Sequence, residues 1–322
     1  MKILANDGIE NSAIESLAKA GFELITTKVA QEQLATYIQT NNIEVLLVRS
    51  ATKVRKELID QCPSLKMIGR GGVGMDNIDV LYAREKGIRV VNTPASSSDS
   101  VAELVFAHLF GMVRFLHDSN RQMPLSGETH FAELKKAYSQ GTELNGKTLG
   151  IVGAGRIGKA VARRAIGLGM NVLFADQHPG NHIFVDLDFF DGRSLEFKFE
   201  TIELEALLTQ SDFISLHVPG SKDGALIDQR ELAMMKPGSG IINAARGGVI
   251  NELALLEALN NGHLAYAGLD VFENEPNPAV QLLMHSQISL TPHIGAATKE
   301  AQERIGGELA GLIIEAFGTV KA

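Results

Sequence analysis

A glycine-rich turn near the middle of this 322-residue chain constrains the fold more than any other feature. The apolar run 149–152 predicts a strand, and Gly153-Ala154-Gly155-Arg156-Ile157-Gly158 follows it directly. A predicted helix at 159–168 and a second predicted strand at 171–175 come next. In such a unit Gly153 permits a tight turn, Gly155 lets a pyrophosphate approach the backbone, and Gly158 lets helix and strand pack closely. The pattern therefore predicts a Rossmann sheet that binds a dinucleotide at the start of the helix.

The residue after the second strand indicates which dinucleotide binds. Asp176 stands there, and a carboxylate in this place accepts hydrogen bonds from the ribose hydroxyls and repels a 2′-phosphate. The following residues, Gln177-His178-Pro179, supply no arginine that could bind such a phosphate. We therefore expect NAD as the cofactor rather than NADP.

Two series of alternating strands and helices indicate an α/β fold with two domains. In the first series, strands are expected at 3–5, 23–26, 45–48, 66–68 and 89–91. In the second, they are expected at 149–152, 172–175, 213–217, 241–243, 267–271 and 288–291, before a final amphipathic helix at 299–317. Because such alternation predicts a parallel sheet covered on both faces, we expect two doubly wound parallel-sheet domains.

Two segments depart from this alternation. A run rich in helix-capping serines, 96–100, precedes an apolar helix expected from Val101 to about Arg121, which could lie between domains or in a dimer interface. In 183–199, alternating apolar residues flank Asp191-Gly192, a strong hairpin signal. We expect a β-hairpin at the sheet edge, with a structural role.

Three residues in the C-terminal half could carry chemistry beside a nicotinamide. Arg246, Glu275 and His293 each stand at or just after a predicted strand end, and ligands of open parallel sheets bind at those ends. Arg246 could hold a carboxylate and polarise a carbonyl through paired hydrogen bonds. His293 could exchange a proton near neutral pH, and Glu275 could orient its ring and stabilise the imidazolium. Taken singly, each could instead be a surface or structural residue.

Composition excludes several other classes of function. A net charge of −8 argues against a nucleic-acid or acidic-membrane partner, although a small anionic substrate needs only a local arginine cluster. Without an apolar run of about 18 residues, no membrane span is expected. Cys62 stands alone and no signal peptide is recognised, so we expect a cytoplasmic protein. No metal site is expected, and His108, His117, His217 and His285 are interpreted as structural or exposed.

With these residues placed, the whole chain resembles the D-isomer-specific 2-hydroxyacid dehydrogenase family. The resemblance rests on Gly153–Gly158, Asp176, Asn243–Gly248, Leu269–Pro276 and Thr291–Ala296. It implies that Arg246, Glu275 and His293 are catalytic. It further implies that the NAD site is lined by Gly153, Gly155, Arg156, Ile157, Gly158, Asp176, Val218, Ala244, Ala245, Asp270, Gly295 and Ala296.

Within the family, the chain looks most like the members that oxidise D-3-phosphoglycerate to 3-phosphohydroxypyruvate, the first step of serine biosynthesis. The signals are residues 48–54, 69–79, 92–94 and 141–150. This resemblance implies that Arg49 and Arg70 bind the substrate phosphate, whereas Gly72, Val73, Gly74 and Arg246 bind its carboxylate.

The resemblance also implies the domain arrangement. A flavodoxin-like substrate-binding domain would comprise 1–96 plus 297–322, and the NAD-binding Rossmann domain would comprise 97–296, with a cleft between them. A homodimer through the NAD domains is expected from the long helix. Since the chain ends at Ala322, serine feedback through a C-terminal regulatory domain is not expected.

Three alternative functions stay open. The first is a reductase of glyoxylate, hydroxypyruvate or lactate. The second, of a different class, is an NAD-sensing corepressor or scaffold, although the sequence shows no appended tail or basic patch. The third, a methyltransferase with a glycine-rich nucleotide loop, is disfavoured by the Arg246, Glu275 and His293 set.

Overall fold

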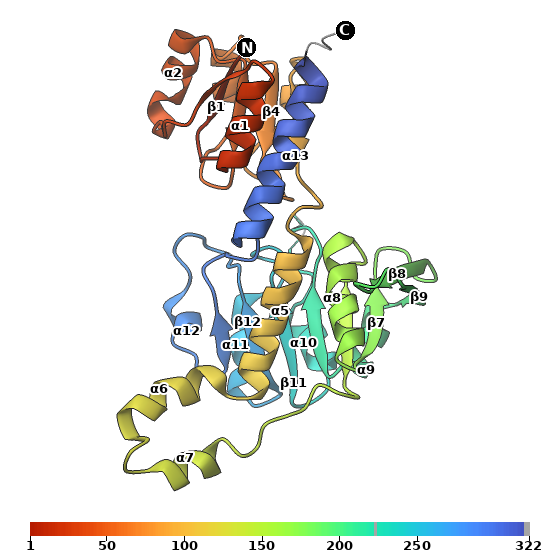
Figure 1. Ribbon diagram of the computed structural model, residues 1–322. Coiled ribbons are helices and arrows are strands. Elements are labelled where there is room, and N and C mark those ends of the chain that lie inside the picture. The colour runs from red at the N-terminus through yellow and green to blue at the C-terminus, as the bar shows by residue number, and fades with distance from the viewer. Residues whose placement is uncertain (222–223, 319–322) are drawn as a thin grey trace. The chain divides into compact units, whose positions relative to one another are not determined.

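The computed structural model describes residues 1–221 and 224–318 and divides into two compact units (Figure 1). Unit 1 comprises Met1–Ser98 and Ala296–Ala322, of which 319–322 lie outside the described residues, and unit 2 comprises Asp99–Gly295. The boundaries expected from the sequence, at 96/97 and 296/297, fall within two residues of these limits.

Unit 1 contains a five-stranded parallel sheet with the order β2-β1-β3-β4-β5, which is the flavodoxin-like order. The strands are β1 (Lys2–Ala5), β2 (Glu23–Ile25), β3 (Val45–Val48), β4 (Met67–Arg70) and β5 (Arg89–Asn92). The central strand β3 reads Val-Leu-Leu-Val and is buried throughout, as expected when helices cover both faces of a parallel sheet.

The helices of unit 1 bury both faces of this sheet. They are α1 (Asn11–Lys19), α2 (Leu34–Asn41), α3 (Lys56–Gln61), α4 (Val80–Glu85) and the C-terminal α13 (Lys299–Phe317). Helices α1 and α13 lie side by side and share one apolar cluster with the sheet (Figure 1). Helices α2, α3 and α4 pack into a second cluster. The last helix of the chain therefore completes the domain that its first residues begin.

Unit 2 contains an eight-stranded sheet with the order β13-β12-β11-β10-β6-β7-β9-β8. The strands are β6 (Thr148–Val152), β7 (Asn171–Ala175), β8 (His182–Asp188), β9 (Ser194–Ile202), β10 (Phe213–Leu216), β11 (Ser239–Asn243), β12 (Leu264–Leu269) and β13 (Ile288–Leu290). All neighbouring pairs are parallel except β8 with β9. The chain leaves β6 toward β7 and later returns to its other side as β10, so the strand order reverses between β6 and β10.

Helices again cover both faces of this sheet. They are α5 (Ser98–Val113), α8 (Arg156–Gly167), α9 (Leu204–Gln210), α10 (Gln229–Met234), α11 (Glu252–Asn260) and α12 (Val280–Leu283). Helices α5 and α8 bury one apolar cluster against the sheet, and α9 to α12 bury another. The α/β class with two doubly wound parallel sheets is thus confirmed.

The expected helix from Val101 to about Arg121 is two helices, so the sequence prediction was wrong there. Helix α5 ends at Val113, and α6 (Leu116–Ser126) starts after a bend of 54°. Phe115 between them adopts a left-handed backbone (φ 54°), a conformation that ends an α-helix. Helix α6 and the short α7 (Phe131–Ala137) extend from the end of α5, away from the sheet (Figure 1).

The hairpin predicted at 183–199 is confirmed as β8 and β9, which pair antiparallel from His182–Glu200 to Asp188–Ser194. Gly192 in its turn has φ 85°. Strand β9 also extends the main sheet by pairing parallel with β7, and the rings of Phe174 and Phe199 meet at 5.3 Å.

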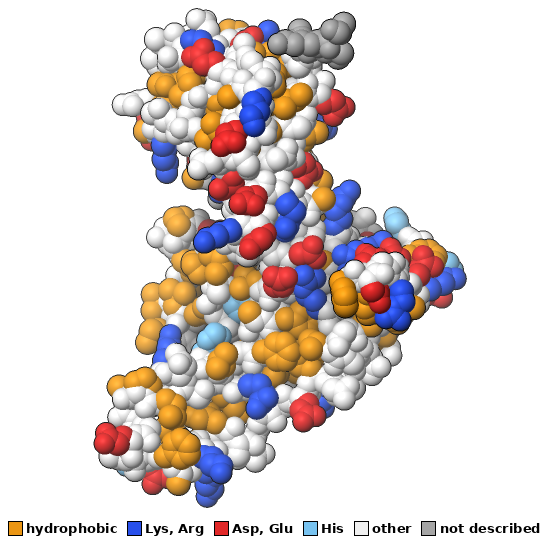
Figure 2. All heavy atoms as spheres, in the orientation of Figure 1, with side chains coloured by type: hydrophobic (Ala, Val, Ile, Leu, Met, Phe, Trp, Pro, Cys, Tyr) orange, Lys and Arg blue, Asp and Glu red, His pale blue; other side chains and the backbone are white. Residues whose placement is uncertain are grey.

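Apolar side chains are exposed along α5, α6 and α7 (Figure 2). They are Phe110, Leu116, Met123, Leu125 and Phe131, with exposed fractions between 42% and 78%. Within the described residues no single helix is long and apolar enough to cross a membrane, although the bent pair α5 and α6 would pass by length and composition together.

Candidate active site

The glycine turn lies at the point in unit 2 where the strand order reverses. It joins β6 to α8, and the turn after the neighbouring β10 packs directly against it. A Cβ on Gly153, which has φ 102°, would lie 2.5 Å from the carbonyl oxygen of His217. Only glycine therefore fits this position. Open α/β sheets bind their ligands outside such a reversal.

The other two motif glycines have different surroundings. A Cβ on Gly158 would overlap with the carbonyl oxygen of Gly153, so helix α8 can approach the turn only with glycine there. A Cβ on Gly155 would meet no atom of the described residues within 4 Å. Its lack of a side chain is therefore not required by packing within the protein. An open backbone at the start of a 12-residue helix fits the diphosphate of a dinucleotide.

Asp176 follows β7 and lies against the same turn. Its Oδ2 accepts a hydrogen bond from the amide of Ala154 at 2.7 Å, and its Oδ1 accepts one from the amide of Gln177. The carboxylate is thus fixed beside the glycine turn, where the sequence motif requires it. Its role toward a ribose stays a prediction.

Arg246 lies in the loop after β11, and the buried side chain of Asn243 shapes this loop. The Asn243 amide donates to the carbonyl oxygen of Arg246 at 2.9 Å, and its oxygen accepts from the amide of Ala245 at 3.1 Å. Arg246 itself is half-buried, and its Nη1 donates to the carbonyl oxygen of Ala245. The guanidinium is therefore carried on a loop whose shape is fixed from within.

Glu275 and His293 form a hydrogen-bonded pair. Nδ1 of His293 lies 2.8 Å from Oε2 of Glu275, and the other carboxylate oxygen accepts from the amide of Phe272 at 3.0 Å. The two side chains are 42% and 36% exposed, so both can reach a ligand from solvent. The carboxylate fixes one ring nitrogen, which leaves Nε2 as the nitrogen for proton exchange.

The loop that carries His293 is held by Asp270, a residue only 1% exposed. Its Oδ1 accepts hydrogen bonds from the hydroxyl of Thr291 and the amide of Ile294, and its Oδ2 accepts from the amide of Gly295. The main-chain carbonyl of Asp270 accepts from the amide of His293 at 2.8 Å. These bonds stabilise His293 in a left-handed backbone (φ 55°), which is unusual for a residue with a side chain.

The structure brings the three candidate catalytic loops together at one edge of the sheet. They follow the adjacent strands β11, β12 and β13. A Cβ on Gly247, next to Arg246, would overlap with the carbonyl of Phe272, so these two loops touch. A pocket of about 420 Å³ adjoins the His293 pair, lined mainly by apolar residues such as Phe272, Leu283 and Leu290.

The candidate substrate residues of unit 1 also lie together. Arg49 follows β3 and Arg70 ends β4, and these strands are neighbours. A Cβ on Gly71 would lie 3.7 Å from the Arg49 side chain, and one on Gly72 would overlap with the Arg70 guanidinium. The amide of Gly72 donates to Thr93, and the carbonyl of Val73 accepts from Asn92. Arg49 further forms an ion pair with Glu10 at 3.4 Å.

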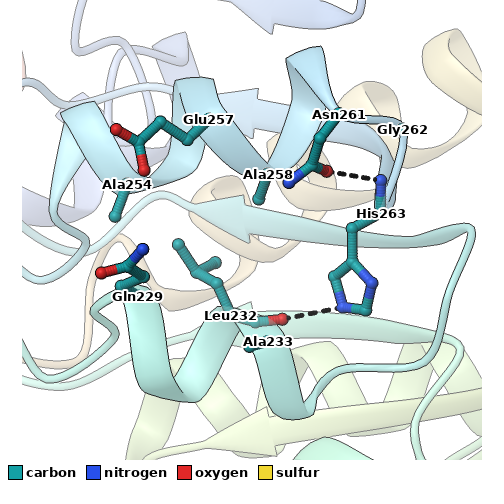
Figure 3. Close-up of a pocket in the computed structure, with 9 residues that line it drawn as sticks. All are labelled: Gln229, Leu232, Ala233, Ala254, Glu257, Ala258, Asn261, Gly262 and His263. Atoms are coloured by element: carbon teal, nitrogen blue, oxygen red, sulfur yellow. Dashed lines mark hydrogen bonds between the residues drawn. The ribbon is translucent and has the colours of Figure 1, made fainter.

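A second pocket, of about 450 Å³, lies between α10 and α11 (Figure 3). His263 stands at one end, where its ring meets the carbonyl of Leu232 at 3.1 Å. The pocket contains none of the residues that the sequence singled out.

Sequence reasoning did not identify how Asn243 and Thr291 support their loops. Asn243 and Thr291 stand inside the quoted motifs, but their roles depend on contacts that local spacing does not reveal. Among the described residues, no group of three or more His, Cys, Asp or Glu could hold a metal ion.

Comparison with known proteins identifies the family. Residues 106–295 match the model described as D-isomer specific 2-hydroxyacid dehydrogenase, NAD binding domain. The chain belongs to this family. Unit 2 is accordingly its NAD(P)-binding domain.

Individual relatives carry different names. The chain is 38% identical over 318 residues to D-3-phosphoglycerate dehydrogenase of Bacillus subtilis, covering 98% of this chain but 56% of the relative. It is 39% identical over 322 residues to hydroxypyruvate reductase of Thermotoga maritima, covering 98% of each. The chain therefore spans about half the length of the phosphoglycerate dehydrogenases that it matches, but nearly all of the reductase.

A solved structure described as a glyoxylate reductase from Paecilomyes thermophila superimposes with a TM-score of 0.80 at 30% identity. The match covers 98% of this chain and 94% of that one.

Proposed function

We propose that the protein is an NAD-dependent D-2-hydroxyacid dehydrogenase that oxidises D-3-phosphoglycerate to 3-phosphohydroxypyruvate, in a reversible reaction. The observation that supports the reaction class is the hydrogen bond between Glu275 and His293, next to the loop that carries Arg246. All three residues lie in the NAD(P)-binding domain that matches the family. When bound, NAD supplies the acceptor for the hydride that leaves C2 of the substrate.

In this proposal each residue of the set has one task. Nε2 of His293 takes the proton of the C2 hydroxyl, and Glu275 stabilises the imidazolium that results. Arg246 binds the substrate carboxylate and the developing carbonyl oxygen, since a guanidinium stays charged and donates two parallel hydrogen bonds. In the reverse direction His293 returns the proton to the carbonyl oxygen.

NAD is proposed rather than NADP because Asp176 is fixed beside the glycine turn. The Asp176 carboxylate would repel the negatively charged 2′-phosphate of NADP. A similar solved structure is described as an NADPH-dependent reductase, so we attribute the preference for NAD to Asp176 of this chain and not to the fold.

The choice of substrate rests on unit 1, the proposed substrate-binding domain. Arg49 and Arg70 flank the loop 71–74, whose backbone is hydrogen-bonded to Thr93 and Asn92. Two guanidinium groups at one loop suit a phosphate, and the amides of Val73 and Gly74 suit a carboxylate, whereas the Gly72 amide already donates to Thr93. The cleft expected between the two domains stays a prediction.

A second candidate is a reductase of hydroxypyruvate or glyoxylate. It is favoured by the near-complete overlap with the Thermotoga reductase. The ion pair of Arg49 with Glu10 also favours it, because that carboxylate would compete with a phosphate. A corepressor or scaffold role has less support, since such a protein has no need of a fixed Glu275–His293 pair.

We further propose that the chain forms a homodimer through unit 2. The exposed apolar side chains of α5, α6 and α7 gather where the chain extends away from the sheet (Figures 1 and 2). An apolar surface of this kind is typical of a protein–protein interface.

The proposed reaction is tested by the oxidation of NADH with a series of 2-oxo acids, followed by absorbance. Phosphohydroxypyruvate should give a kcat/KM well above those of hydroxypyruvate, glyoxylate and pyruvate, and NADH should be preferred to NADPH. Equal or higher values with an unphosphorylated acid would refute the substrate and leave the reaction class intact. Absence of turnover with every acid would refute the class.

The role of His293 is tested by His293→Ala. Removing the proton-transfer group should lower kcat by about 10²-fold or more. His285→Ala, which changes another histidine of unit 2, should keep near-normal activity. A His293→Ala enzyme with normal kcat would contradict the assignment.

The phosphate site is tested by Arg49→Gln and Arg70→Gln. Losing a hydrogen bond to a charged group should raise the KM for the phosphorylated acid by about 10-fold or more, while the KM for hydroxypyruvate changes little. Arg84→Gln, an exposed arginine on α4, is the matched control. An equal change in the KM values for the phosphorylated and the unphosphorylated acid would show that neither arginine binds the phosphate.

The dimer is tested by sedimentation equilibrium, which should give a particle of two 34.7-kDa chains. Leu116→Glu should shift the equilibrium to monomer, because it places charge in the proposed interface. Leu81→Glu, at a 76%-exposed leucine of unit 1, should not. A wild-type monomer at high concentration would refute the proposal.

A further inference from the structure

A line of polar side chains runs from α6 through the core of unit 2 to the loop that carries His293. It consists of His117, Ser289, His108, Thr291 and Asp270. His108 is 2% exposed, Ser289 is 6% exposed and Asp270 is 1% exposed, so the line crosses an interior otherwise built of apolar residues. Polar groups in such a place are retained only when each is hydrogen-bonded.

The distances join these residues without a gap. Nε2 of His117 lies 3.0 Å from Oγ of Ser289, which lies 2.7 Å from Nδ1 of His108. Nε2 of His108 lies 3.0 Å from Oγ1 of Thr291, which lies 2.7 Å from Oδ1 of Asp270.

The chemistry of the last residue fixes the direction of the inner bonds. An ionised carboxylate can only accept hydrogen bonds, so the Thr291 hydroxyl is the donor in its hydrogen bond to Asp270. Thr291 must then accept from His108, which requires the proton on Nε2. A neutral ring protonated there can only accept at Nδ1, so Ser289 donates to it. Burial supports the neutral form, because it lowers the pKa of His108 to about 4.

Two glycines make room for the two histidines. A Cβ on Gly268 of β12 would lie 3.0 Å from the Cβ of His108. A Cβ on Gly111 of α5 would lie 2.7 Å from Nε2 of His117, so the bend after α5 can bring this ring back over the helix. The absence of a side chain at Gly268 and Gly111 therefore leaves the space that the two histidines occupy.

We propose that His108 is a positioning residue for His293: it orients the Thr291 hydroxyl, which fixes the Asp270 carboxylate, which holds the 291–295 loop. The role toward His293 rests on the proposed dehydrogenase function. Asp270 accepts three hydrogen bonds from this loop. The Thr291 hydroxyl donates one of them and is itself hydrogen-bonded to His108. Without His108, the hydroxyl can rotate, and the strained backbone of His293 loses part of what stabilises it.

The first test needs no activity. Histidine side-chain ¹⁵N spectra of the full-length protein at neutral pH should show His108 as the neutral tautomer protonated on Nε2, assigned by the signal lost in His108→Gln. A ring protonated on Nδ1 alone, or a doubly protonated ring, would overturn the proposal.

The second test compares two replacements at the same place. His108→Gln keeps an N–H in the position of Nε2, whereas His108→Leu removes it. In His108→Leu the ¹⁵N signals of His293 should shift or broaden, and in His108→Gln and the control His263→Gln they should stay as in the wild type. His263 is a suitable control because it is another hydrogen-bonded histidine of unit 2, half-buried beside the carbonyl of Leu232 (Figure 3).

The same variants give a kinetic readout. In His108→Leu we expect kcat to fall by about 10- to 100-fold, because small displacements of a reacting group are costly. The dissociation constant of NADH, measured by fluorescence, should rise less than kcat falls, because the glycine turn and Asp176 lie outside the line, although Asp270 and Gly295 belong to the expected NAD site. His108→Gln should restore most of kcat. Thr291→Val, which removes the hydroxyl and keeps the shape, should reproduce the loss if His108→Leu does not fold.

The outcomes separate this inference from the proposed function. Equal losses in His108→Gln and His108→Leu would reduce His108 to a packing residue and overturn the proposal. If the wild type turns over no 2-oxo acid, the proposed function fails, and the His293 signals still decide whether His108 positions that ring.

Discussion

Parallel pairing of neighbouring strands is the constraint on which the rest of unit 2 depends. Strands β6, β10, β11, β12 and β13 are held side by side in one direction, so all of them end at the same edge. The residues that follow these ends are Gly153, His217, Ala244, Asp270 and Thr291. The pairing of these strands therefore brings a glycine turn, an arginine loop and a histidine loop, far apart in the sequence, to one edge of the sheet.

A buried carboxylate then gives this edge its detailed shape. Removing a charge from water is costly, but Asp270 recovers stabilisation from three donors of a single short loop. Those donors can converge only if the backbone turns left-handed at His293. The strain at the candidate catalytic residue and the burial of the neighbouring charge are thus two parts of one arrangement. Glu275, on the same loop as Asp270, then orients the His293 ring through its hydrogen bond to Nδ1.

Much of this could be predicted from sequence because it is encoded locally. The parallel strands follow from short apolar runs, the nucleotide turn from three glycines, and the hairpin from Asp191-Gly192. The bend at Phe115 could not be predicted, because neither a glycine nor a proline stands there and the left-handed conformation falls on an aromatic residue. The pairing of His108 with Thr291 was equally hidden, because it joins residues 183 positions apart and depends on space left by Gly268. The grouping of Arg49 with Arg70 around one loop agrees with their strand-end positions, whereas the ion pair with Glu10 was not foreseen.

The hairpin β8–β9 has a consequence for how the protein behaves in concentrated solution. Without it, the larger sheet would end at β7, a strand with apolar side chains and open backbone groups that could accept a strand from another molecule. With it, the sheet ends at β8, which carries Asp186 and Asp188 and is joined to β9 by a tight turn. The charges of Asp186 and Asp188 oppose pairing of this edge with a second copy. Phe184 of β8 and Phe190 beside the turn are nevertheless exposed, so the insertion moves the open edge of the sheet to a new strand and leaves apolar surface on it.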